Sequence, residues 1–148
     1  MEIPSSVAKE HEDLHTLLSV AAREKGPLGG VARQVDGLLH PHLVKEEEFA
    51  LPILSVLTLL PEEGFRGDLK EVMSMVMRLR KELPRMLEEH IQIAEALDVL
   101  AQEADRAGRR EYVELAARLS LHIQMEEEVL YPAALLIGSY IEMKAVRA

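Results

Sequence analysis

Apolar residues in this chain recur at intervals of three and four, the spacing of an amphipathic helix and not of a strand. Glycine and proline clusters at 26–30 and 61–64, together with Gly108, divide this pattern into four stretches. Leu, Glu, Ala, Arg and Met, which favour helices, dominate the stretches. Because short connections make neighbouring helices antiparallel, the sequence predicts an all-α fold, an up-down-up-down four-helix bundle that forms a single domain over residues 1–148.

The glycine and proline residues that interrupt the pattern also predict where the helices begin and end. We expect helices from about Ser5 to Lys25, from about Val31 to Leu60, from about Asp68 to Ala107, and from about Arg109 to near the C-terminus. Asp68 is a favourable N-cap residue for the third of these. Interior prolines should kink the helices or break them locally, and these are Pro41, Pro52, Pro84 and Pro132.

Each expected helix carries one apolar stripe that a bundle would bury. Histidine, or histidine followed by glutamate, interrupts every stripe at a position where leucine would be expected. The stripe of the last helix should comprise Leu115, Leu119, His122, Glu126, Val129, Ala133, Leu136 and Tyr140. His40 lies off the stripe of the second helix, beside Pro41, which favours a surface position or an outer contact to the buried groups.

Composition excludes several classes of function. The chain has no Cys, so it holds no disulfide, thiolate zinc site, iron–sulfur cluster or thiol nucleophile. A net charge of −9 argues against a nucleic-acid partner. No apolar run approaches the roughly 20 residues of a membrane span, and the N-terminus does not have the pattern of a signal peptide. We therefore expect a cytoplasmic protein without a membrane partner.

The chain contains an internal repeat of its polar residues. Residues 42–52 match residues 122–132, and in both copies Glu lies four residues after His and Pro ten residues after it. Upstream, His11 precedes His42 by 31 residues and His90 precedes His122 by 32. The chain therefore reads as two helical hairpins that carry the same polar set.

This polar set favours a metal site. A buried ionised carboxylate is costly unless it is paired or binds a metal ion, and the stripes offer no Lys or Arg. Residues four apart lie on one helical face, so each His/Glu pair can point at one place. The expected donors are His11, His15, His42, Glu46, His90, His122 and Glu126. They are too many for one tetrahedral zinc and suit two ions that share bridging carboxylates. Imidazole and carboxylate without thiolate favour iron, with manganese or zinc as alternatives.

The pattern His…His-x-x-x-Glu…Glu-His…His-x-x-x-Glu-Glu on four expected helices resembles the hemerythrin-like, or HHE cation-binding, family. The resemblance covers nearly the whole chain, from about His11 to about Pro132. It implies a four-helix bundle with a carboxylate-bridged, non-haem di-iron centre. It also implies binding of dioxygen or a related small ligand, or a role in oxygen or iron sensing or handling, and thus a binding protein more than an enzyme.

The resemblance also assigns ligands by position. One iron would take His11, His42 and Glu46, and the other would take His90, His122 and Glu126, with both glutamates as bridges.

The chain departs from the oxygen-carrying members of the family. They have a second histidine four residues after that of the third helix, where this chain has Ala94, and the extra histidine here is His15. We therefore expect an inverted asymmetry, with a filled three-histidine iron near the first two helices and an open iron near the last two. Alternatively, His15 lies outside the ligand set and contacts a ligand. The oxygen carriers would select Glu127 as the last carboxylate, whereas the repeat favours Glu126.

Three alternatives remain at this point. Residues 11–15 fit the H-E-x-x-H motif of zinc peptidases, with His11 and His15 as ligands and Glu12 as general base, but no strand edge is expected to hold a peptide. A ferritin-like site expects Glu-x-x-His on two helices, and only Glu12–His15 fits among the core histidines. The third alternative is a metal-free helical interaction module. Tyr131 either lines the interior or covers the bend at Pro132.

Overall fold

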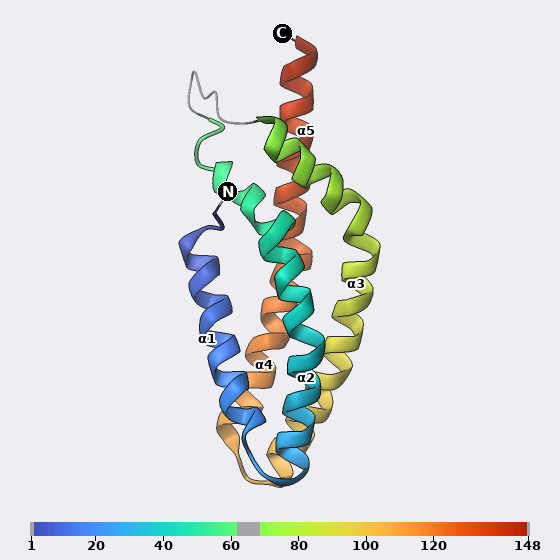
Figure 1. The fold of residues 1–148 in the computed structure, drawn as a ribbon. Coiled ribbons are helices and arrows are strands. Elements are labelled where there is room, and N and C mark those ends of the chain that lie inside the picture. The colour runs from blue at the N-terminus through green and yellow to red at the C-terminus, as the bar shows by residue number, and fades with distance from the viewer. Residues whose placement is uncertain (1, 62–68, 148) are drawn as a thin grey trace.

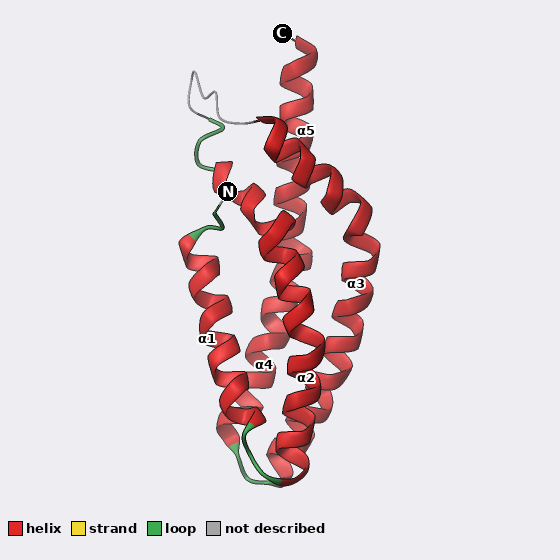
Figure 2. Cartoon of the chain, in the orientation of Figure 1, coloured by secondary structure: helices red, strands yellow, loops and turns green. Residues whose placement is uncertain are grey.

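The structure, a computed structural model, describes residues 2–61 and 69–147. Its elements in chain order are α1 (Ser5–Ala22), α2 (Gly26–Lys45), η1 (Glu46–Ala50), η2 (Leu51–Val56), α3 (Leu69–Arg106), α4 (Arg110–Met125), η3 (Glu126–Leu130) and α5 (Tyr131–Arg147). Figures 1 and 2 show these helices and the connections between them, and the described residues contain no strand. The predicted all-α class is confirmed.

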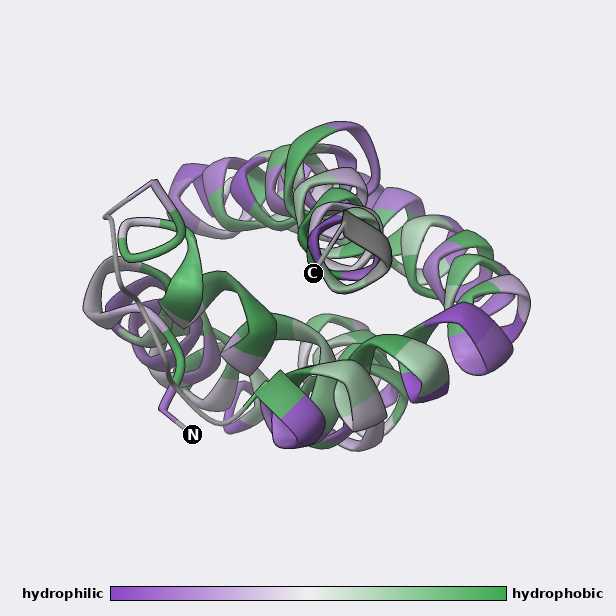
Figure 3. Ribbon diagram, turned by 90° about the horizontal axis from the view of Figure 1, so that it is seen from above, coloured by the Kyte–Doolittle hydropathy of each residue, from purple (hydrophilic) through white to green (hydrophobic). Residues whose placement is uncertain are grey.

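The helices form four long paths around one interior. In Figure 1 the α1–α2 and α3–α4 connections lie at the same end of the molecule, and α4 continues through η3 into α5. Neighbours in the chain pack on each other, from α1 through α4, and α1 also contacts α4. Figure 3, seen from above, shows the helices surrounding a common interior. This arrangement is that of a four-helix bundle.

The second helix begins earlier than the sequence predicted. The glycine and proline cluster at 26–30 was expected to be a connection, but α2 starts at Gly26 and includes it. Gly26 has a φ of +74°, which glycine adopts without strain, and Pro27 stands in the first turn, where its missing N–H costs nothing. At its other end this path is helical only to Val56, not to Leu60. The expected N-cap Asp68 lies outside the described residues.

Two π-helical segments, η1 and η3, occupy matching positions in the repeat. The Leu51 N–H donates to the Glu46 carbonyl, and the Tyr131 N–H donates to the Glu126 carbonyl, each five residues back. Pro52 and Pro132 follow directly after these two donors. The other interior prolines, Pro41 and Pro84, lie within α2 and α3. A π-helical turn inserts one extra residue into a helix and is frequent at functional sites.

The insertion at η3 changes which face of α5 is buried. The predicted stripe placed Val129, Leu136 and Tyr140 in the core, but they are 55%, 69% and 37% exposed. Because one extra residue turns the following helix by about 100°, the buried set moves forward along the chain. It comprises Tyr131, Ala134, Ile137 and Ile141. The stripe prediction for α5 was therefore wrong beyond Glu126.

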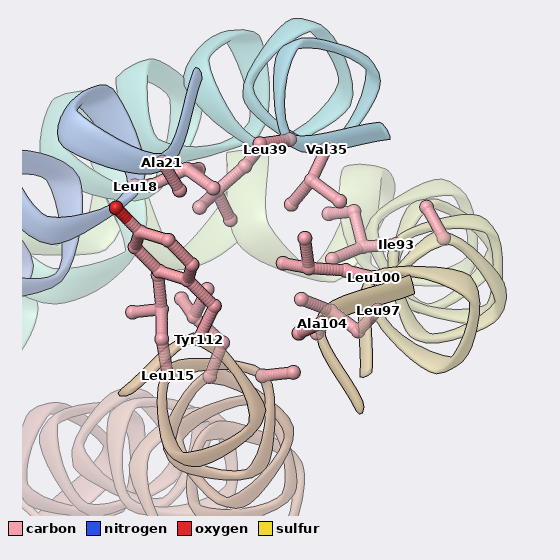
Figure 4. Packing of buried hydrophobic residues seen from close by; sticks show 14 of the residues in the cluster. Leu18, Ala21, Val35, Leu39, Ile93, Leu97, Leu100, Ala104, Tyr112 and Leu115 are labelled. Carbon is pink, nitrogen blue, oxygen red and sulfur yellow. The ribbon is translucent and has the colours of Figure 1, made fainter. Parts of the chain in front are cut away.

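Two apolar clusters lie on either side of a polar layer. The first, drawn in Figure 4, fills the bundle toward the α1–α2 connection and includes Leu18, Leu97 and Leu115. The second surrounds Phe49 and Met86. Along each long path the buried histidines come between residues of the two clusters. The polar groups are thus held between two dry cores.

Gly138 sets the distance between α5 and α3, because a Cβ at this position would lie 2.4 Å from Val76 Cγ1. Val76 is fully buried and cannot move aside. We expect Gly138→Ala to lower the free energy of unfolding by about 1–3 kcal/mol. The matched control is Gly37→Ala in α2, where nothing lies within 4 Å, and it should gain about 0.5–1 kcal/mol. Urea unfolding measures both, and equal stability of the two variants would contradict the close approach.

Candidate metal centre

Six polar side chains lie inside the bundle. His11, His42, Glu46, His90, His122 and Glu126 are each at most 5% exposed. These are six of the seven donors predicted from the sequence. They come from α1, α2, η1, α3, α4 and η3, so the two π-helical segments supply both carboxylates.

The first group of donors combines His42, Glu46, His90 and Glu126, whose ligand atoms lie within 4.8 Å of one another. His42 Nε2 is 2.6 Å from Glu46 Oε1, and His90 Nε2 is 3.4 Å from Glu126 Oε1. The two Nε2 atoms of His42 and His90 are 2.7 Å apart. Four donors therefore face one point.

The second group combines His11, His122 and Glu126. Glu126 Oε2 is 3.6 Å from His11 Nε2 and 3.3 Å from His122 Nε2, and these two nitrogens are 3.0 Å apart. Glu126 thus offers one oxygen to each group, the position of a bridge. Glu46 Oε2 is 3.9 Å from His11 Nε2, so the second carboxylate also lies close to both groups.

The buried donor atoms are better placed to bind metal ions than to form hydrogen bonds with one another. Both oxygens of Glu46 and Oε2 of Glu126 are buried and have no hydrogen-bond partner among the described residues. Leaving such groups unpaired costs about 1–3 kcal/mol each. Two nitrogens bound to one ion at about 2.1 Å lie roughly 3 Å apart, close to the separation within each histidine pair. The residues present therefore fit a pair of ions.

The grouping differs from the one that the resemblance implied. His11 and His42 were expected on one ion and His90 and His122 on the other, but each pair joins the two hairpins, His11 with His122 and His42 with His90. The cause is the packing of α2 against α3 and of α1 against α4. Each candidate ion position is built across the interface between the two repeats.

Carboxylates outside the two groups orient three of the four rings. Nδ1 of His11 lies 3.3 Å from Glu47, Nδ1 of His42 lies 3.0 Å from Glu89, and Nδ1 of His90 lies 2.9 Å from Glu127. An Nδ1–H that donates to a carboxylate leaves Nε2 free for a metal ion. Sequence reasoning did not predict that any of these residues orients a histidine ring, although Glu47 and Glu127 follow the repeated Glu46 and Glu126 directly. Glu127, which was the alternative ligand, belongs to this outer set.

His122 lacks such a partner. Its Nδ1 is buried without a hydrogen bond to any described residue. The residue before His90 is Glu89, which contacts His42, and its counterpart before His11 is Glu10. Glu10 instead accepts a 2.8 Å hydrogen bond from Arg118. The two groups therefore differ both in their donors and in the support of their rings.

Tyr131 joins the first group. Its hydroxyl lies 3.3 Å from Nε2 of both His42 and His90, and its side chain is 2% exposed. Burial and the nearby carboxylates of Glu46 and Glu126 raise the pKa of this phenol, which keeps it protonated. The π-helical turn of η3 brings it inward, a feature that the apolar period did not reveal.

His15 lies in neither group. It is half-buried, and its ring stacks on that of His40 with centroids 5.7 Å apart. The expected three-histidine ion near α1 and α2 therefore has no third histidine in this arrangement. The same placement separates the two histidines of the H-E-x-x-H motif, since His11 points into the bundle and His15 does not.

The electrostatics of the two buried carboxyl groups show which charges must be balanced. Burial, together with the charge of Glu126, raises the pKa of Glu46 well above its usual value. Burial also acts to raise the pKa of Glu126, but the neighbouring Glu46, His11, His122 and His90 hold it well below its usual value. Glu46 is thus the protonated member of this pair of carboxyl groups. A metal ion would displace this proton on binding.

This raised pKa predicts a pH-dependent effect of Glu46→Gln on the metal-free protein. Because the folded-state pKa of Glu46 exceeds its ordinary value of 4.5, stability is lost as the pH rises above that value. Gln carries no charge at any pH, so the variant should be about 1–3 kcal/mol more stable than the parent at pH 8. The difference should shrink toward pH 5.

Urea unfolding at both pH values, in the presence of a chelator, measures this difference. Glu128→Gln is the matched control, since Glu128 is exposed in the same acidic run, and it should change little at either pH. A loss of stability in metal-free Glu46→Gln at pH 8 would contradict the proposed charge balance.

Comparisons with known proteins provide no family. No protein-family model matches the chain, and neither a curated protein nor a solved structure does so. Within the described residues, no helix is both long enough and apolar enough to cross a membrane. The function must therefore be argued from the buried histidine and glutamate groups themselves.

Proposed function

We propose that this chain is a hemerythrin-like protein that holds two iron ions and binds dioxygen or a related small ligand. We also propose that consecutive helices of the bundle run in opposite directions, up-down-up-down, and that the helices are kinked at their interior prolines. The observation that carries it is the pair of buried groups that share Glu126, one with His42, Glu46 and His90 and the other with His11 and His122. Manganese or zinc are the alternative ions.

The donor set supports two ions more than one. Each oxygen of Glu126 is directed at a different histidine pair. A single ion would therefore leave one histidine pair without an ion. Two carboxylates bring two negative charges, which divalent ions offset in a dry interior. Glu47, Glu89 and Glu127 hold the rings of three histidines in the tautomer that presents Nε2.

The difference between the groups supports a place for the small ligand. The His42/His90 group has four protein donors and the Tyr131 hydroxyl beside them, whereas the His11/His122 group has three donors. We infer that the open coordination position lies on the His11/His122 side, the reverse of the asymmetry expected from the sequence. Bound iron supplies the reversible coordination of a small ligand. The flanking apolar clusters exclude water, and Tyr131 keeps a protonated hydroxyl at the centre.

Metal content tests the donor set. Anaerobic loading with Fe²⁺, followed by desalting and metal analysis, should give two ions per chain for the parent protein. The double variant Glu46→Gln/Glu126→Gln should lose nearly all bound metal, because each removed charged ligand lowers affinity by at least about tenfold. The control Glu48→Gln/Glu128→Gln changes exposed members of the same acidic runs and should retain two ions. Unchanged stoichiometry in the first variant would contradict the bridging role.

Visible spectra test the ligand. The anaerobic ferrous protein should develop a new absorption band on exposure to oxygen, and the band should disappear when oxygen is removed. Irreversible oxidation of the iron would indicate a scavenging or redox role and would contradict reversible oxygen binding. The absence of any oxygen-dependent change in the iron-loaded protein would contradict oxygen binding altogether.

A further inference from the structure

Two histidines that the buried centre does not use lie together at the surface. His15 belongs to α1 and His40 to α2, 25 residues apart in the sequence. Their rings stack with centroids 5.7 Å apart and an interplanar angle of 29°. His40 is exposed and His15 is half-buried, so both rings are open to ions in solution.

These two rings line a pocket that reaches toward the buried centre. The pocket has a volume of about 280 Å³, and its walls include His11, Glu12, His15, His40 and Glu47. Glu47 lies between surface and interior, because its side chain is 48% exposed while its Oε1 is 3.3 Å from His11 Nδ1. The ring of His11 is therefore the boundary between the pocket and the His11/His122 group.

The repeat shows that the buried centre does not require this histidine pair. His90 matches His11, and the position four residues later holds Ala94 where the first hairpin has His15. His122 matches His42, and the position two residues earlier holds Ser120 where the first hairpin has His40. The second hairpin builds its half of the centre without either histidine. The histidine pair is therefore a feature of the first hairpin alone, and its role must be separate from building the buried centre.

We propose that His15 and His40 form a surface site that captures a divalent transition-metal ion and delivers it to the buried centre past His11 and Glu47. Two imidazoles with carboxylates nearby are a donor set for zinc, iron or cobalt ions. Exposed side chains change rotamer within nanoseconds, so both rings can turn a nitrogen toward one ion. Glu12 and Glu47 line the same pocket as the two histidines and bring carboxylates to it. The delivery step rests on the proposed function, whereas the capture site does not.

Equilibrium binding tests the capture site alone. In the Glu46→Gln/Glu126→Gln background, which disables the buried centre, Zn²⁺ titration should still show one ion bound per chain. Adding His15→Gln/His40→Gln should weaken this binding at least about tenfold. The matched control adds Glu88→Gln and Gln92→Ala, two exposed side chains in a different pocket that lies along α3, and it should leave Zn²⁺ binding unchanged. Equal Zn²⁺ affinity with and without the two histidines would overturn the proposal.

Loading kinetics test delivery in the otherwise unaltered chain, so this result does not depend on the folding of the disabled variants. Stopped-flow uptake of Co²⁺ should be at least about tenfold slower in His15→Gln/His40→Gln, with the final stoichiometry unchanged. An unchanged rate would overturn the delivery role. Loss of one of two bound ions would also overturn it, because His15 would then be a ligand of the buried centre. Failure of the parent chain to load any ion would count against the proposed function, and the Zn²⁺ titration would still decide the capture site.

Discussion

The structure depends on two carboxylates, Glu46 and Glu126, that lie within a hydrophobic bundle at no more than 1% exposure. A buried carboxylate without compensation is too costly for a domain of this size to retain. The surrounding residues provide that compensation in layers. Imidazoles from four helices face the carboxylates, and outer glutamates orient three of these rings. Two bound metal ions would offset the negative charge that remains on the carboxylates.

The π-helical segments place the carboxylates at this level of the bundle. Each segment begins at the glutamate that follows its histidine by four residues and ends two residues before a proline. A regular helix would carry the following residues along the predicted stripe and leave Tyr131 off it. The extra residue instead turns Tyr131 toward His42 and His90 and rotates the rest of α5. The same local insertion therefore builds the centre and sets the packing of the last helix.

The sequence predicted the helical class and the buried positions of six of the seven proposed donors, because both depend on the three-and-four spacing along single helices. It did not predict the insertion at η3, since one added residue leaves the local composition unchanged, and so the exposure of Leu136 was missed. The pairing of His11 with His122 depends on how two hairpins pack, which spacing within one helix does not determine. The outer partner Glu89 lies off every stripe, and the family pattern placed it beside His90 without predicting its contact with His42. His15 fitted the spacing of a ligand, but it stacks on His40 at the surface.

We propose that two ions bind between the hairpins, each at a histidine pair, and that Glu126 bridges them. Anomalous diffraction at the iron edge, from crystals of the anaerobically iron-loaded protein, tests it most directly. We predict two peaks in the interior, one beside Nε2 of His42 and His90 and the other beside Nε2 of His11 and His122. A single interior peak, or an interior without any peak in fully loaded protein, would contradict the account.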